Sequence, residues 1–202
     1  MIEVESKSVS PEELAVQCQR GSRDSFELLV ERFGPRIFQF LFRYVGNSHD
    51  AEDLTQETFV SAFRSLGRYD PTYSFSTWLF TIAKRTAQSH HRSRGPARSP
   101  HREPSSSEDP LDVDDPSAVL SRKDDRNSIW DEVRQLKPKL SEVLWLRYGE
   151  EFSVAETARI MGTNVIHVKV LLHRARSALA KKLRSCRDGV DGVRHEVYHE
   201  IK

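Results

Sequence analysis

The segment 75–94, FSTWLFTIAKRTAQSHHRSR, combines aromatic side chains with basic charge and contains no carboxylate. A helix that only packs against its neighbours usually carries mixed charge on its outer face. Cations can hold a phosphate backbone while aromatic rings stack on bases that have left the duplex. The segment therefore fits a single-stranded nucleic acid, and an ordinary amphipathic helix with a basic end fits it equally well.

Charge is strongly segregated along the chain, although its formal net charge is only +1. Residues 75–102 contain six Lys or Arg and no acid, and residues 157–187 contain eight basic residues and no acid. Between these blocks, residues 103–125 contain eight acids against Arg122 and Lys123. This pattern predicts two surfaces that face polyanions and an acidic connector between them.

The sequence offers little for catalysis or metal binding. His90, His91 and His101 lack a Cys, Asp or Glu at a metal-ligand spacing, and Ser, His and Asp residues are scattered without a nucleophile–base pattern. We therefore expect no catalytic residue, no metal site and no cofactor. The two cysteines, Cys18 and Cys186, are too few for a disulfide framework, which favours a reducing compartment. The polar N-terminus resembles no signal peptide and no apolar run reaches transmembrane length, so we expect a cytoplasmic protein.

Helical spacing of apolar residues predicts an all-α fold of two small domains. In the first, Ser10 and Glu13 have the spacing of a capping box. The Gly34-Pro35 pair predicts a break between two helices, and a further helix is expected at 50–65. A loop with Gly67 and Pro71 precedes a helix that resumes near Ser76. The predicted organisation is an N-terminal domain at 10–94, a flexible acidic linker rich in Pro, Ser and Asp at 95–118, a C-terminal domain at 119–185, and a polar tail at 186–202.

The C-terminal domain carries a helix-turn-helix pattern. Ser153 and Glu156 begin a short helix that ends at Met161, and Gly162 is suited to the turn that follows. In the second helix an inward stripe is expected at Val168, Leu172, Ala175 and Leu179, and an outward side at His167, Lys169, Val170, Leu171, Arg174 and Arg176. A basic second helix after a glycine turn predicts a recognition helix in the major groove. The alternative is a helical hairpin with a solvated basic face.

These motifs together resemble the bacterial extracytoplasmic-function sigma factors, the two-domain initiation subunits of RNA polymerase. The stretches DAEDLTQETFVSAFRSL and FSTWLFTIA are similar to the family's polymerase-binding and promoter-melting helices. LSEVLWLRYGEEFSVAETARIMG and HVKVLLHRARSAL are similar to its C-terminal helix-turn-helix. The resemblance covers about residues 10–94 and 119–185, and it implies three partners: core RNA polymerase, promoter DNA both as duplex and as the single non-template strand, and an anti-sigma factor.

The resemblance also implies roles for individual residues. Ala51, Leu54, Thr58 and Ala62 are expected to face inward, so the polymerase contact falls on the opposite edge, at Asp53, Gln56 and Glu57. The helix at 75–94 and the loop at 68–73 correspond to the parts that capture the minus-ten strand and receive an extruded base. The implied minus-ten residues are Arg68, Tyr69, Tyr73, Phe75, Trp78, Lys84, Arg85, His91 and Arg92. The implied minus-thirty-five residues are Asn164, His167, Lys169, Val170, Leu171, Arg174 and Arg176.

Several positions depart from the family pattern. Family members often carry Asn in place of Arg85 and Asp in place of Ser89, and helical spacing indicates that Trp78 packs partly inward. The common Val-Lys-Ser-Arg-Leu of the recognition helix becomes VKVLL, which ends at Leu172. Arg85, Val170 and Leu171 support one alternative to a working sigma factor, a degenerate sigma-like protein that binds polymerase or an anti-sigma factor without reading promoters. A second alternative is a free-standing helix-turn-helix regulator, which would not explain the N-terminal domain.

Overall fold

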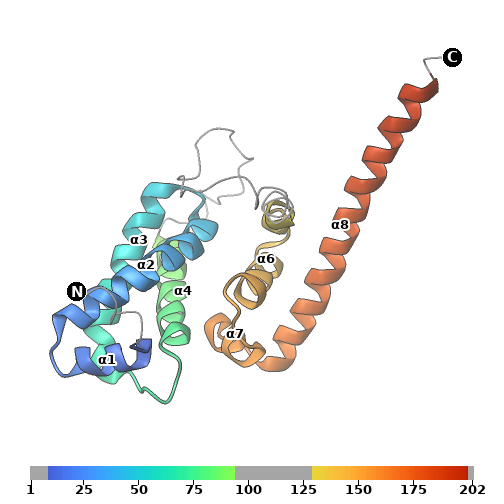
Figure 1. Cartoon of the computed structure of the whole chain (residues 1–202). Coiled ribbons are helices and arrows are strands. Elements are labelled where there is room, and N and C mark those ends of the chain that lie inside the picture. The colour runs from blue at the N-terminus through green and yellow to red at the C-terminus, as the bar shows by residue number, and fades with distance from the viewer. Residues whose placement is uncertain (1–8, 94–128, 200–202) are drawn as a thin grey trace. The chain divides into compact units, whose positions relative to one another are not determined.

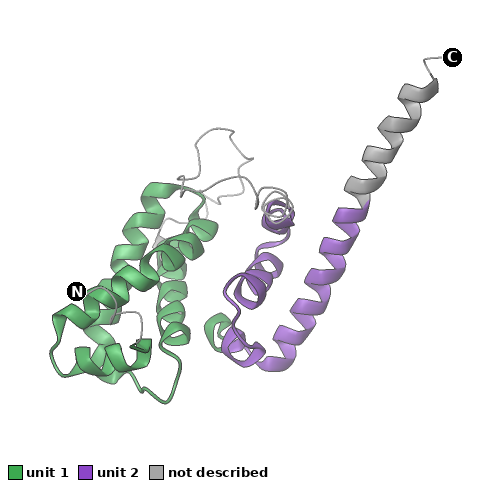
Figure 2. Ribbon diagram, viewed as in Figure 1, with its two compact units in different colours: residues 1–105, 159–162 green, residues 106–158, 163–202 purple. Residues whose placement is uncertain are grey.

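A computed structural model describes the backbone of residues 9–93 and 129–199 and the side chains as far as residue 184. These ranges are helical and contain no strand, which confirms the predicted all-α fold. Figure 2 divides the chain into two compact units, residues 1–105 with 159–162 and residues 106–158 with 163–202. The predicted linker at 95–118 lies outside the described residues, as do the first residues of the predicted C-terminal domain.

The first unit is built from four α-helices and one 3-10 turn (Figure 1). These are α1 (Pro11–Gln19), α2 (Arg23–Val45), α3 (Ser48–Ser65), η1 (Leu66–Arg68) and α4 (Phe75–Ser93). The predicted capping box is present, because Ser10 Oγ accepts from the Glu13 N–H at 3.1 Å and Glu13 Oε2 accepts from the Ser10 N–H at 3.0 Å. Asn47 begins α3 in a similar way, since its Oδ1 accepts from the Asp50 N–H at 2.8 Å. Local sequence rules therefore determine where these helices start.

The predicted break at Gly34-Pro35 is wrong. Helix α2 runs without interruption from Arg23 to Val45, with Pro35 inside it. A proline removes one backbone hydrogen bond and crowds the preceding turn. The buried residues of α2 nevertheless continue across this point at helical spacing, at Leu29, Phe33, Ile37, Phe40 and Leu41. Burial of one continuous stripe on both sides of the proline outweighs the local cost, and the helix persists.

Aromatic rings form much of the core of the first unit. Phe75, at the start of α4, lies with its ring centroid 5.5 Å from those of Phe33, Tyr69 and Trp78. Further along α4, Phe80 packs against Phe40 at 5.2 Å. These contacts join helix α2, helix α4 and the loop between η1 and α4. The aromatic core therefore fixes the first part of α4 and the start of the loop that precedes it.

The second unit contains a helical segment at 129–134 and three longer elements (Figure 1). These are α6 (Pro138–Leu144), which continues into the π-helical turn η3 (Trp145–Gly149), then α7 (Val154–Met161) and α8 (Val165–His199). Gly149 lies against the ring of Trp145, and a Cβ at this position would come within 2.6 Å of the ring, so any larger residue would displace it. Helix α8 continues to His199, so most of the segment predicted as a polar tail is helical in its backbone.

Candidate nucleic-acid interface

Helix α3 separates a buried face from an exposed edge as predicted. Ala51, Leu54, Thr58 and Ala62 are buried. Asp53, Gln56 and Glu57 are exposed, at spacings that place them on neighbouring turns of one side. His49 lies one turn before Asp53, with its Nε2 3.8 Å from the carboxylate. The edge therefore offers two carboxylates and one amide to a partner.

The same side of α3 becomes apolar toward its C-terminal end. Val60 is exposed, and Phe63 is 54% exposed although its ring lies 5.0 Å from that of Phe26 on α2. The sequence analysis did not assign these residues to any surface. The available signal was their spacing, because Val60 lies three residues after Glu57 and Phe63 three after Val60, and residues three to four apart on a helix are neighbours.

Helix α4 presents a basic stripe to solvent. Trp78 is half-buried, and Arg85 and Arg92 are exposed at helical spacing from it, so the three residues lie along one side of the helix. His91 is exposed beside Arg92. The partly inward packing predicted for Trp78 is confirmed, because its ring contacts those of Tyr69 at 5.1 Å and Phe75 at 5.5 Å.

Two aromatic residues assigned to DNA belong to the core instead. Phe75 is 0% exposed and its ring is enclosed by other aromatic rings, so it cannot stack on a base. Tyr69 is also buried, and its hydroxyl donates to the Tyr73 carbonyl at 2.6 Å. Burial raises the pKa of Tyr69 to about 12, with the nearby carboxylates of Glu12 and Asp70 adding to the effect. Both side chains lie in the core of this unit, where they support the loop from inside.

Lys84 was also assigned to the minus-ten strand, but its side chain is buried. It is 7% exposed, because it lies one turn from both Phe80 and Ala87, which are buried. A lysine in such a position buries its aliphatic stem along the apolar neighbours. The cations that α4 presents to solvent within the described residues are therefore Arg85, His91 when protonated, and Arg92.

The loop between η1 and α4 presents Arg68 and Tyr73 to solvent. Its tip is ordered by Asp70, whose Oδ1 accepts from the Thr72 backbone N–H at 2.9 Å and from the Thr72 hydroxyl at 2.8 Å. These hydrogen bonds lower the pKa of Asp70. The loop thus holds a cation and an exposed aromatic ring beside the start of α4.

The chain from Ser153 to α8 has the predicted helix-turn-helix geometry. Ser153 and Glu156 form a capping box at the start of α7, with bonds of 2.9 and 3.2 Å. Gly162 follows α7 with φ of 64°, the left-handed conformation in which glycine is favoured. Asn164 then caps α8, because its Oδ1 accepts from the His167 N–H at 2.7 Å. The turn is therefore built from local caps that the sequence encodes.

Helix α8 separates into an inward stripe and an outward side. Val168, Leu172 and Ala175 are buried as predicted, and Leu179 is half-buried. The exposed residues of the predicted set are Asn164, His167, Lys169, Val170, Arg174 and Arg176. Leu171 was expected among them, but it is 6% exposed, because it lies three residues after Val168 and four before Ala175 and so extends the buried stripe.

The apolar part of the outward side is formed by Ile166 and Val170. They are one turn apart and are 75% and 40% exposed, and sequence analysis missed Ile166. Lys169 and Arg174 are exposed nearby. The outward side therefore combines an aliphatic pair with cations.

Tyr148 is a further residue that was not predicted from the sequence. Its hydroxyl accepts hydrogen bonds from Arg176, one of them from Nε at 2.9 Å, and the guanidinium carbon lies 5.6 Å from the ring centroid. Tyr148 thereby restricts the orientation of Arg176. No local signal links the two positions, because they are 28 residues apart.

The described residues show neither a metal-binding cluster nor a membrane-spanning helix. Within these ranges, no group of three or more His, Cys, Asp or Glu is placed to hold a metal ion. No helix in the described part of the chain has the length and apolar character needed to cross a membrane.

Comparison with known proteins identifies both units. The Sigma-70 region 2 family matches residues 29–96, and the Sigma-70, region 4 family matches residues 126–179. The chain is 33% identical over 186 residues to the ECF RNA polymerase sigma factor BldN of Streptomyces coelicolor, covering 89% of this chain and 68% of BldN. It is 31% identical over 182 residues to the RNA polymerase sigma-H factor of Pseudomonas aeruginosa, covering 86% of this chain and 93% of that protein.

A solved structure shares the fold. It is that of the sigma factor RpoE in complex with the anti-sigma factor NepR from Bartonella quintana, with a TM-score of 0.62 and 22% identity over 79% of this chain and 96% of RpoE. The fold, the two family matches in this order and the two relatives agree with each other. The chain therefore belongs to the extracytoplasmic-function family of RNA polymerase sigma factors, which are transcription initiation factors.

Proposed function

We propose that three separate surfaces of the described residues divide the work of initiation. The acidic edge of α3 binds core polymerase, the exposed side of α4 with its preceding loop captures the single-stranded minus-ten element, and the outward side of α8 reads the minus-thirty-five duplex. The observation that carries the proposal is the contrast in exposed charge between these helices. Two carboxylates mark α3, whereas the exposed charged residues assigned on α4 and α8 are all basic.

On α3, Asp53, Gln56 and Glu57 are the proposed polymerase contact. Their side chains are already exposed, so binding requires no rearrangement of the core. A basic surface on the partner would match the two carboxylates and would accelerate association. Val60 and Phe63 continue this side of the helix and would supply buried apolar area in the complex.

On α4, the proposed strand contacts are Arg85, His91 and Arg92, together with Arg68 and Tyr73 from the loop. Cations along one side of a helix hold successive phosphates, and an exposed tyrosine ring offers a stacking face for an extruded base. Trp78 contributes its exposed portion at the junction between loop and helix. Burial removes Tyr69, Phe75 and Lys84 from the set of strand contacts.

On α8, Ile166 and Val170 would meet methyl groups of thymine in the major groove, and His167 and Arg174 would supply polar contacts. Lys169 and Arg176 would hold phosphates, with Tyr148 orienting Arg176. Asn164 lies at the N-terminus of α8, where recognition helices approach base edges. Leu171 has no contact role, because it is buried.

Transcription in vitro with purified core polymerase tests the proposal. Specific initiation on genomic fragments supports it. Binding to core polymerase without initiation supports the degenerate, sigma-like alternative, and absence of both supports a free regulator. The double variant Asp53→Lys, Glu57→Lys is expected to lose core binding with unchanged helix content, because exposed substitutions rarely change stability by more than about 0.5 kcal/mol. Retained core binding in this variant would remove α3 from the proposal.

We also infer that the chain acts in the cytoplasm, where core polymerase and the chromosome are found, and that an anti-sigma factor controls it. The RpoE structure that shares this fold is a complex with such a factor, which supports the second inference. The expected result is that core polymerase and the anti-sigma factor compete for binding to a tagged copy of the chain. Independent binding of the two would contradict control by occlusion.

A further inference from the structure

Two side chains of α1 are anchored to the loop that links η1 to α4. Gln19 Nε2 donates to the Leu66 carbonyl at 2.9 Å and to the Tyr69 carbonyl at 2.8 Å. Glu12 Oε1 accepts from the Phe75 N–H at 2.8 Å. One anchor therefore holds the start of the loop and the other holds its end.

These anchors are placed where they can control Arg68 and Tyr73. Both exposed residues lie between the two anchored points. Within the loop, Asp70 orders the tip through Thr72, and the buried ring of Tyr69 packs on Phe75 and Trp78 of α4. Glu12 also places a carboxylate at the N-terminus of α4, where the helix macrodipole favours negative charge. The position of the loop relative to the rest of the unit thus depends on polar contacts with α1 in addition to the packing of Tyr69.

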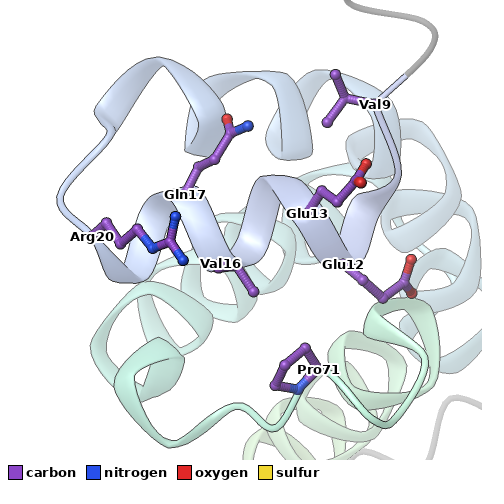
Figure 3. Close-up of a pocket in the computed structure, with 7 residues that line it drawn as sticks. All are labelled: Val9, Glu12, Glu13, Val16, Gln17, Arg20 and Pro71. Carbon is purple, nitrogen blue, oxygen red and sulfur yellow. The ribbon is translucent and has the colours of Figure 1, made fainter.

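Packing does not replace these anchors along the middle of the loop. Between α1 and Pro71 lies an open groove of about 420 Å³ whose walls include Glu12, Val16 and Gln17 (Figure 3). Figure 3 shows Pro71 across this space from α1. The middle of the loop therefore gains little support from direct packing on α1, and its contact with this helix rests on the bonds at its two ends.

We propose that Gln19 and Glu12 are positioning residues for promoter opening. By fixing both ends of the loop, they hold Arg68 and Tyr73 in the place where the displaced strand meets α4. This inference rests on the proposed function of the loop. It predicts that α1 affects DNA opening without contacting DNA and without contributing to core binding.

Gln19→Glu and Gln17→Glu form a matched pair of variants on α1. Gln19→Glu replaces the donating NH₂ group by an oxygen that faces two carbonyls, so both loop bonds are lost. Gln17 instead accepts through Oε1 from the Ser25 hydroxyl at 2.6 Å, and Gln17→Glu keeps an accepting oxygen. The two variants therefore share the helix and the change in charge and differ in the loop anchor.

The measurement is the rate of open-complex formation by the full chain with core polymerase, followed with a fluorescent base analogue in the minus-ten region. We expect Gln19→Glu to slow opening about tenfold, which is the size expected for the loss of one to two net hydrogen bonds. A premelted template should restore most of the rate, and affinity for core polymerase should be unchanged. Equal rates for Gln19→Glu and Gln17→Glu would overturn the inference.

Tyr73→Ala separates this inference from the function on which it rests. If Tyr73→Ala alone leaves opening unchanged, the proposed function of the loop fails. If it slows opening and Gln19→Glu adds little further effect in the same chain, the two act through one loop. Additive effects would mean that Gln19 acts elsewhere and would overturn its positioning role. If Gln19→Glu lowers the melting temperature markedly, Gln19→Met replaces it in the same double-mutant comparison with Tyr73→Ala, because methionine has neither a hydrogen-bond donor nor a charge.

Discussion

Replacing Phe75 by alanine tests whether this residue belongs to the core or to the DNA-binding surface. Its side chain is fully buried, and its ring contacts those of Phe33, Tyr69 and Trp78, each with centroids 5.5 Å away. Truncation of a buried phenylalanine to alanine typically costs about 3–5 kcal/mol. Loss of three aromatic contacts and incomplete collapse of the cavity place the expected cost toward the upper end of that range. A domain of this size has a total stability of about 5–15 kcal/mol, so the loss removes a large fraction of it.

The measurement is urea-dependent hydrogen exchange of the full chain, followed by mass spectrometry of peptides from α2 to α4. Slowly exchanging amides in these helices report the free energy at which the first unit opens. Phe63→Ala provides the matched control, because Phe63 is 54% exposed and is expected to cost about 1 kcal/mol or less.

Phe75→Leu separates packing from base contact. Leucine keeps most of the buried apolar volume, so we expect it to retain most of the stability and also the rate of promoter opening. Two results would refute the core assignment: equal losses of stability for Phe75→Ala and Phe63→Ala, or normal stability with strongly slowed opening for Phe75→Leu.

Three further predictions follow from the exposed and buried surfaces. Arg85→Ala should weaken open-complex formation. It should also reduce the slope of log affinity against log salt concentration by about 0.7, the value for one lost phosphate contact to a single strand. Lys84→Ala should instead lower stability and leave this slope unchanged. Replacing Ile166 and Val170 by serine should relax the preference for thymine among sites selected from a random library, at a cost of about 1–3 kcal/mol per affected base pair. Folding raises the pKa of Tyr69 to about 12 from about 10 in the unfolded chain. The stability that the neutral tyrosine contributes should therefore be complete below pH 10 and be lost between pH 10 and 12. Tyr69→Phe should flatten this pH dependence of the unfolding free energy in a urea titration.

The features predicted correctly from sequence are those that depend on neighbours along the chain. The caps at Ser10 and Ser153 and the left-handed Gly162 each involve residues within four positions. The inward face of α3, including Leu54, follows from the 3.6-residue period. Such local rules require no knowledge of the partner helices.

Features that depend on tertiary contacts were missed. The bonds of Gln19 to the loop span 47 and 50 residues, and the bond of Glu12 spans 63 residues. The break expected at Pro35 is absent because burial on both sides of it maintains the helix. In each case the local pattern is compatible with several structures, and contacts with distant segments select one of them.

Lys84 and Leu171 were misassigned for a shared physical reason. Each lies next to a residue that is buried in the core, Ala83 in one case and Leu172 in the other. The apolar face of a core helix is often wider than a single line of residues, and its edges depend on how far the neighbouring elements extend over it. Sequence periodicity locates the centre of the face but not these edges. The surface left for DNA is therefore narrower than the basic composition suggests. Among the side chains of α8 that the structure describes, Ile166 is the most exposed large apolar residue, at 75%. We therefore expect α8 to recognise DNA more through methyl contacts and a few oriented cations, such as Arg176 held by Tyr148, than through a row of hydrogen-bonding side chains.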